Sequence, residues 1–278
     1  MLKVLQGNVR RSPLARDIIY QLAREKSADL LIISEQGVRP SSLNWFTDEL
    51  GTAAIWVVNP RKVLVQEKGA GRGFVWIKTN GVTYISVYLT PNELRQDTLR
   101  KMNSLEDAIR DMTGEIVMAG DFNARAPEWG MSETDARGED ILDLSARLDL
   151  AVLNVGNTTT FRRPGYGQTI PDISFATENL AARITDWQVL EDFSASDHQY
   201  ISFEVHDERR LTRRDEAQKC CGWNIKRLNR EILVNTLRRG ETAILGKAIR
   251  PGNTDDAEDI VKGIMTLLEK ACNKKTDP

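Results

Sequence analysis

The sequence predicts a layered α/β domain. Strand-like and helical patterns alternate from the N-terminus to about residue 150, and mostly short strands follow over residues 151–205. That order is typical of a domain in which helices cover β-sheets. The chain has 278 residues, of which 41% are hydrophobic and 28% charged. This length and composition indicate a globular protein with one large domain and an appendage, or with two smaller domains.

The elements of the first part are expected in a definite order. A strand over 4–9 ends in polar residues, and Ser12 and Pro13 then favour the start of a helix. A buried strand over 29–34 and a short helix over 43–50 come next. The strands expected after these are 53–59, 73–78 and 82–89.

A long amphipathic helix is expected over 93–112. Its apolar face carries Leu94, Leu99, Met102, Leu105 and Ile109. A short buried strand over 115–119 follows, and then a helix over 137–148 with Asp135 as its N-cap.

Polar residues recur where apolar strand-like runs end. The residues in such positions are Asn8, Glu35, Asp121, Asp172 and Asp197. Loops at strand ends on a rigid scaffold are where functional sites are usually assembled. We therefore expect these side chains to meet.

Bulk properties restrict the function only weakly. The longest apolar run, over 30–33, is too short to span a membrane, and no signal peptide precedes the first strand. The three cysteines, Cys220, Cys221 and Cys272, suggest neither a disulfide framework nor a C-x-x-C metal site, so a reducing compartment is expected. Residues 1–206 hold 22 Lys and Arg against 28 Asp and Glu, net −6, and 207–278 hold 16 against 12, net +4. Neither value excludes a nucleic-acid partner, because a local patch can bind phosphates.

The most informative segment is Gly120-Asp121-Phe122-Asn123, which follows the apolar strand over 115–119. It presents a carboxylate and a carboxamide from one tight turn, and Gly120 permits the bend and a close backbone approach. The alternative is an Asx-type turn that merely caps the strand.

The second segment is Ser196-Asp197-His198, which contains one of only two histidines. An imidazolium there could neutralise a phosphoryl oxygen, or an imidazole could act as a base. The alternative is a solvated histidine in a surface loop. Asp172 lies in an apolar run, where a carboxylate is costly unless paired, and His198 is the candidate partner. Glu35 is a suitable oxygen ligand for Mg²⁺, although a lone acid at a strand end is commonly just solvated.

Together, these motifs resemble the exonuclease-endonuclease-phosphatase superfamily, which includes DNase I, abasic-site endonucleases and phosphoinositide phosphatases. The matching residues, in order, are Asn8, Glu35, Tyr88, Gly120-Asp121-Phe122-Asn123, Asp172 and Ser196-Asp197-His198.

Further segments resemble the endonuclease domain of non-LTR retrotransposons, especially the R1/TRAS-like insect group. They are Asp121 to Ala124, Trp129-Gly130, Thr134 to Gly138, Leu153 to Gly156, Thr159-Thr160-Phe161 and Asp172 to Ala176. Repair enzymes of the superfamily usually carry an arginine two residues before the equivalent of Asp172, and this chain has Ile170 there.

The resemblance implies a four-layered α/β sandwich, two mixed sheets face to face with helices outside. Glu35 would bind Mg²⁺, for which Mn²⁺ could substitute, with Asn8 and Asp197 near it. Asp121 would orient or deprotonate the attacking water, held by Asn123. Asp172 would keep His198 protonated to stabilise the scissile phosphate, and Tyr88 would donate to it, with Asn8 also in the catalytic set.

The partner implied is double-stranded DNA, with no membrane and no small-molecule substrate. Thr158 to Ile170 is expected to form a hairpin whose tip carries Arg162, Arg163 and Tyr166 and reaches a DNA groove, although an exposed turn with incidental arginines is the alternative. The full set of expected DNA-binding residues is Thr160, Arg162, Arg163, Tyr166, Arg125 and Ser196.

The biology implied is nicking of nuclear target DNA to give a 3′-hydroxyl and a 5′-phosphate. The 3′-hydroxyl would prime reverse transcription of the element's RNA, which the polymerase part of a polyprotein would bind. The endonuclease domain is expected over 1–206. Residues 207–278 resemble a charged, partly helical connector toward a reverse transcriptase. The alternatives are an abasic-site repair endonuclease and a catalytically silent nucleic-acid-binding module of the same fold.

Overall fold

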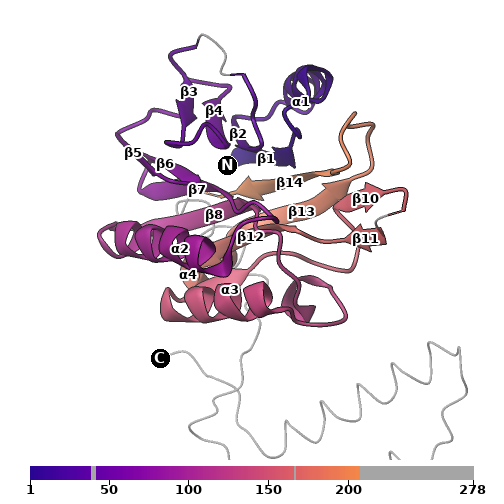
Figure 1. Ribbon diagram of the computed structural model, residues 1–278. Coiled ribbons are helices and arrows are strands. Elements are labelled where there is room, and N and C mark those ends of the chain that lie inside the picture. The colour runs from indigo at the N-terminus through magenta and orange to yellow at the C-terminus, as the bar shows by residue number, and fades with distance from the viewer. Residues whose placement is uncertain (39–41, 166, 207–278) are drawn as a thin grey trace, which may run out of the picture. The chain divides into compact units, whose positions relative to one another are not determined.

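The fold is known from a computed structural model that describes residues 1–38, 42–165 and 167–206 (Figure 1). The connector predicted over 207–278 lies outside the described residues, so the boundary near residue 206 stays a prediction. No helix among the described residues is long and apolar enough to cross a membrane.

Two six-stranded sheets form the centre of the described part. The first consists, in spatial order, of β13 (Ile184–Leu190), β14 (Tyr200–Val205), β1 (Leu2–Asn8), β2 (Leu30–Ser34), β4 (Ala53–Val57) and β3 (Trp45–Thr47). The second consists of β5 (Glu67–Gly71), β6 (Phe74–Thr79), β7 (Val82–Tyr88), β8 (Glu115–Asp121), β12 (Asp172–Thr177) and β9 (Leu150–Val152). Both sheets are mixed, because β1 pairs with β2 and β7 with β8 in parallel while the other pairs are antiparallel.

Helices cover the outer faces of both sheets. Helix α1 (Pro13–Glu25) packs on the first sheet, where Ile19 joins Leu31 in one apolar cluster. Helices α2 (Arg95–Arg110) and α3 (Ala136–Arg147) cover the second sheet (Figure 1). The short helix α4 (Glu178–Ala181), a 3₁₀ turn (Pro127–Trp129) and a separate hairpin of β10 (Phe161–Arg163) and β11 (Gly167–Thr169) complete the fold. The predicted four-layered sandwich is confirmed.

The facing surfaces of the two sheets enclose an apolar core that turns polar at one end. Side chains alternate across a strand, so Leu2, Val4, Gln6 and Asn8 of β1 share the inward face. Leu2 and Val4 belong to the core between the sheets, whereas Gln6 and Asn8 are equally buried but polar. Similar polar ends occur on β2, β7, β8 and β12. Their buried side chains are Ser34, Ser86, Asp121, Asp172 and Ser174.

The helix-start signals are confirmed. The Ser12 hydroxyl accepts a hydrogen bond from the Ala15 backbone N–H at 3.3 Å, and the Asp135 carboxylate accepts from that of Gly138 at 2.7 Å. On α2, however, Leu94 is the N-cap and is 73% exposed, so the apolar face begins later than predicted.

The helix predicted over 43–50 is wrong. The segment forms strand β3, in which buried Trp45 contacts the rings of Tyr20 and Trp56. The buried carboxylate of Asp48 then accepts hydrogen bonds from the backbone N–H groups of Leu50, Thr52 and Ala53. These bonds close a turn and prevent a helix from continuing.

Strand β5 was not predicted either. It is an edge strand with mostly exposed residues, so no apolar alternation indicates it.

Candidate active site

The polar end of the inter-sheet core brings together side chains that are far apart in the sequence. Each comes from the end of a strand or from the residue next to it. They are Asn8 of β1, Glu35 after β2, Tyr88 of β7, Asp121 of β8, Asp172 of β12 and His198 before β14. Asp172 begins its strand, yet it pairs with Asp121 at the end of β8 because β12 runs antiparallel to β8.

Asn8 connects two of the carboxylates. Its Nδ2 donates to Glu35 Oε1 at 3.1 Å and to Asp121 Oδ2 at 2.7 Å. Its Oδ1 accepts a hydrogen bond from the backbone N–H of Arg10 at 2.7 Å. This pattern determines the amide orientation, because only the NH₂ group can donate to two carboxylates. Asn8 is therefore a donor in the site, and its oxygen, expected near a metal, is bonded to the backbone instead.

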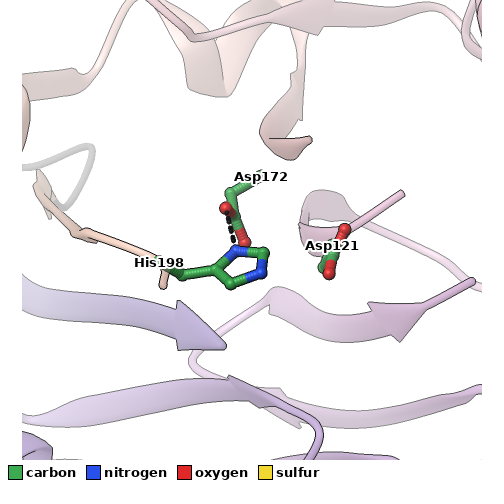
Figure 2. Close-up of side chains that lie close together, drawn as sticks. All are labelled: Asp121, Asp172 and His198. Carbon is green, nitrogen blue, oxygen red and sulfur yellow. Dashed lines mark hydrogen bonds and ion pairs between the residues drawn. The ribbon is translucent and has the colours of Figure 1, made fainter. Parts of the chain in front are cut away.

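His198 lies between two buried carboxylates (Figure 2). Its Nδ1 lies 2.8 Å from Asp172 Oδ2, which also accepts a hydrogen bond from the Thr160 hydroxyl at 2.7 Å. The second ring nitrogen of His198 faces Asp121 (Figure 2). Asp172 thus has the partner that its burial required.

The surroundings favour a charged imidazole. Burial lowers the pKa of His198, but the charge and hydrogen bond of Asp172, together with Asp121 and Glu35, outweigh burial and raise this pKa to about 9. Conversely, burial and the charge of Asp172 raise the pKa of Asp121 well above its usual range. His198 is therefore an imidazolium at neutral pH, and Asp121 is a carboxylate that binds a proton more readily than usual.

The turn after β8 determines the direction of Asp121. Gly120 has φ +155°, and a Cβ at this position would lie 1.9 Å from the carbonyl oxygen of Val87. Only glycine fits such a close approach. Asn123 holds the Asp121 carboxylate through its backbone N–H, at 3.1 Å from Oδ1, whereas its side chain donates to the Leu89 carbonyl. The expected contribution of Asn123 is therefore made by its backbone.

Tyr88 is buried beside the same carboxylates. Burial, then the negative charge of Glu35, raises the pKa of Tyr88 above its ordinary value. The phenol therefore stays protonated and is available as a donor.

The site residues fit a divalent cation. Carboxylate oxygens are the ligands that Mg²⁺ prefers, and Asn8 holds Glu35 and Asp121 side by side. A group of three ligand atoms, from Asp121, Asp172 and His198, also lies within 4.8 Å. We consider Glu35 the better ligand, with Asp121 beside it, because His198 and Asp172 already bond to each other. Burial and, after it, the negative charge of Asp172 raise the pKa of Asp121, and a bound cation would offset both effects.

Asp197 does not fit the expected metal set. Its Oδ2 lies 2.6 Å from Arg10 Nη1 and 3.8 Å from Arg163 Nε, so the carboxylate is already paired with two guanidinium groups. It connects the loop after β1 to the hairpin strand β10.

Two of the expected DNA-binding residues have internal partners. Thr160 is completely buried, and its hydroxyl bonds to Asp172, so this side chain is not exposed for the predicted DNA contact. The Ser196 hydroxyl donates a hydrogen bond to the backbone carbonyl of Asn8 at 2.9 Å and accepts one from the backbone N–H of His198 at 3.2 Å. Ser196 thus ties the histidine loop to β1.

The hairpin exists, but its arginines lie in strand β10 rather than at the tip. Arg162 bonds to the Thr159 hydroxyl and pairs with Glu191, while Arg163 lies near Asp197. Arg125 is exposed after the Asp121 turn. Tyr166 lies outside the described residues, so its DNA contact stays a prediction.

Sequence reasoning missed Arg10 and Arg11 at the rim of the site. Arg10 pairs with Asp197, and Arg11 Nε lies 3.8 Å from Glu35 Oε2. Their position two and three residues after Asn8 was the available signal. Left-handed backbone also surrounds the site. The non-glycine residues with φ between 49° and 55° there are Arg10, Arg11, Glu35, Asn123 and Ala195. Such conformations cost energy and often cluster at functional sites.

Residues 82–202 match the model of a family described as endonuclease–reverse transcriptase. This match covers less than half of the chain. No curated protein matches the sequence.

Solved structures with similar folds are numerous. The endonuclease domain of TRAS1, a telomere-specific non-LTR retrotransposon, is 28% identical with a TM-score of 0.65, covering 75% of this chain and 100% of that domain. An AP endonuclease from Archaeoglobus fulgidus is 18% identical with a TM-score of 0.61, covering 74% and 100%. The 3′ phosphatase NExo from Neisseria, bound to product DNA hairpin, is 16% identical with a TM-score of 0.59 and the same coverage. The last two show the fold alone.

The family match covers the strands that carry Tyr88, Asp121, Asp172 and the loop of His198. The similarity to the TRAS1 domain covers 75% of the chain, a larger share than the family match. The chain is therefore similar to this endonuclease–reverse transcriptase family over residues 82–202 and to a retrotransposon endonuclease domain, and it is a nuclease.

Proposed function

We propose that the chain is a Mg²⁺-dependent endonuclease that nicks one strand of double-stranded DNA. The observation that carries this proposal is the paired carboxylates of Glu35 and Asp121 beside the imidazolium of His198. Positive groups and a bound cation next to a basic carboxylate are what phosphodiester hydrolysis requires. The similarity to the TRAS1 endonuclease domain supports DNA as the substrate.

Each residue has a distinct role in the proposed reaction. Glu35 would hold Mg²⁺ with Asp121 beside it, and the bound ion would neutralise charge on the scissile phosphate. Asp121 accepts a proton from the attacking water, for which its raised pKa is suited. The water oxygen forms a bond to phosphorus as the bond from phosphorus to the 3′-oxygen breaks.

His198 donates from its second ring nitrogen to a phosphate oxygen, while Asp172 keeps the ring charged and oriented. Tyr88 donates to the same charge as it develops. The products are a 3′-hydroxyl, which takes up a proton, and a 5′-phosphate.

We further propose that the 3′-hydroxyl primes reverse transcription of a non-LTR retrotransposon's RNA in the nucleus. The family match to endonuclease–reverse transcriptase proteins supports this role. A polymerase part of the same polyprotein would bind the RNA. An abasic-site repair function is less favoured. Repair enzymes usually carry an arginine two residues before the equivalent of Asp172, whereas this chain has Ile170 there, which is 2% exposed and belongs to the apolar cluster that α2 and α3 cover.

Supercoiled plasmid is the direct test. The wild-type chain should convert it to open circles with Mg²⁺ but not with EDTA, and Mn²⁺ should substitute. A polymerase should extend the nicks without end treatment, because they carry a 3′-hydroxyl. Asp121→Asn and His198→Ala should abolish nicking and keep the wild-type circular dichroism spectrum. The matched control is Asp140→Asn, which removes a carboxylate paired with Arg95 on the surface.

The alternatives give different results. Cleavage confined to duplexes with an abasic site would indicate the repair function. Binding without cleavage in either metal would indicate a silent binding module. Near-normal nicking by folded Asp121→Asn or His198→Ala protein would contradict the assigned site.

The hairpin is proposed to contact a DNA groove. Replacing Arg162 and Arg163 together by Gln should change the pattern of nick positions and weaken the salt dependence of binding. An unchanged pattern and an unchanged salt dependence would rule out this role.

A further inference from the structure

The peptide group between Gly120 and Asp121 is held by side chains of the facing sheet. Its carbonyl accepts a hydrogen bond from Gln6 Nε2 at 3.2 Å, and its N–H donates to Ser34 Oγ at 3.1 Å. Gln6 lies on β1 and Ser34 on β2, whereas the peptide belongs to β8. Both polar groups of one peptide are therefore bonded across the interface between the two sheets.

Ser34 has a second bond that stiffens this arrangement. Its hydroxyl donates to the Val87 carbonyl at 3.2 Å. That carbonyl is the atom that a Cβ on Gly120 would meet at 1.9 Å. The Ser34 hydroxyl thus accepts a hydrogen bond from the Asp121 N–H and donates one to the Val87 carbonyl, against which Gly120 packs.

Gln6 is itself fixed from behind. Its Oε1 accepts a hydrogen bond from the Ser174 hydroxyl at 2.8 Å, and its Nε2 also contacts the Ile173 carbonyl at 3.3 Å. Gln6, Ser34 and Ser174 are each at most 2% exposed, so water does not compete for these bonds.

We propose that Ser34 is a positioning residue for Asp121, and that Gln6 supports the same peptide from its other end. Ser34 directly precedes Glu35, the proposed metal ligand. It therefore connects the strand that leads to Glu35 with the backbone of Asp121, which is proposed to activate the water. Removal of the hydroxyl leaves the buried Asp121 N–H without its acceptor and lets the turn rotate. This proposal rests on the proposed nuclease function.

The chain offers a matched control in Ser86. It is completely buried on β7, and its hydroxyl also crosses between the sheets, donating to the Ile33 carbonyl at 3.1 Å. Ser86 is therefore the same residue type, in the same interface, with the same kind of bond. It differs in that its hydroxyl bonds to β2 and not to the Asp121 backbone, and it has no assigned part in catalysis.

The experiment compares Ser34→Ala with Ser86→Ala on supercoiled plasmid at saturating Mg²⁺. Both melting temperatures should fall, that of Ser34→Ala further, because it loses two buried hydrogen bonds and Ser86→Ala loses one. Ser34→Ala should lower kcat by about 10-fold or more at a nearly unchanged KM, since a small misplacement of a reacting group is costly. Ser86→Ala should keep kcat within about 2-fold of the wild type, which sets the size of a purely structural effect.

Ser34→Cys keeps the size of the side chain and a weak donor and acceptor, so its kcat should lie between those of Ser34→Ala and the wild type. This variant also serves if Ser34→Ala does not fold. Equal kcat losses in Ser34→Ala and Ser86→Ala, or no recovery in Ser34→Cys, would overturn the proposal. Absence of nicking by the wild-type chain would instead refute the nuclease function itself.

Discussion

Replacing Asp172 by Asn should remove the charge that keeps His198 protonated. The pKa of His198 is raised from 6.5 to about 9 in spite of burial, and Asp172 provides the largest opposing effect. That difference corresponds to about 3 kcal/mol in favour of the imidazolium. Without the carboxylate, burial dominates, and we expect His198 to titrate below about pH 7.

The same change should alter the pH dependence of stability. Because the folded pKa is raised, the stabilisation is fully present below pH 6.5 and is lost as the pH rises through about 9. The Asn variant should lose this decline, and its nicking rate should fall from about pH 7 upward, where the wild type still holds a charged ring.

Proton NMR of the metal-free protein is the appropriate measurement. The chain has only two histidines, so His206 is an internal reference, and a His206→Gln variant assigns the signals. A midpoint for His198 in the Asn variant within about half a pH unit of the wild-type midpoint would refute the assigned cause.

Three further predictions concern the same part of the fold. Thr160→Val should lower kcat several-fold at constant KM, because it removes the hydrogen bond to Asp172, the partner of His198. A raised KM would instead support the predicted contact between Thr160 and DNA. Glu35→Gln should raise the Mg²⁺ concentration needed for half-maximal nicking, and Asp197→Asn should leave it unchanged. Equal shifts in both variants would show that Asp197 belongs to the metal site. In denaturant unfolding, Gly156→Ala, at φ +79° with open space around it, should cost about 1 kcal/mol. Gly120→Ala should cost more than about 4 kcal/mol because of its clash, and similar values for both would contradict the close approach.

The site was predictable where a local pattern carried the information. Asp121 and Asn8 end apolar strands, and Asp172 stands in a run where an unpaired charge is too costly. These signals require only neighbouring residues, so they could be recognised without coordinates.

Partners across the fold were not predictable in this way. Asp197 is paired with Arg10, which lies 187 residues away in the sequence, and that ion pair argues against its expected place in the metal set. Thr160 was expected to contact DNA, but its hydroxyl bonds to Asp172, next to the bridge that joins Phe161 and His198. The direction of such a side chain depends on which distant strand lies beside it.

The fold shows the same division. Helices with capping residues were predicted close to their observed bounds, because a cap and an apolar stripe are local. Strand β3 was mistaken for a helix because the contacts that extend it, from Trp45 to Tyr20 and Trp56, are tertiary. The strands predicted at β1 and β2 did include Gln6 and Ser34. Why these two buried positions are polar could be understood only from the hydrogen bonds that they make to the facing sheet.

The first strand of the domain pairs with the last, since Leu2 faces Val205 across β1 and β14. During synthesis, β1 must therefore wait for almost the whole domain before it gains this neighbour, and His198 arrives only just before it. We therefore expect a nascent or prematurely terminated chain without His198 to be inert, rather than a weak nuclease. The adjacency of these two strand ends also makes the domain a candidate for circular permutation, in which a short linker joins residues 2 and 205 and new ends open in the exposed turn between α2 and β8.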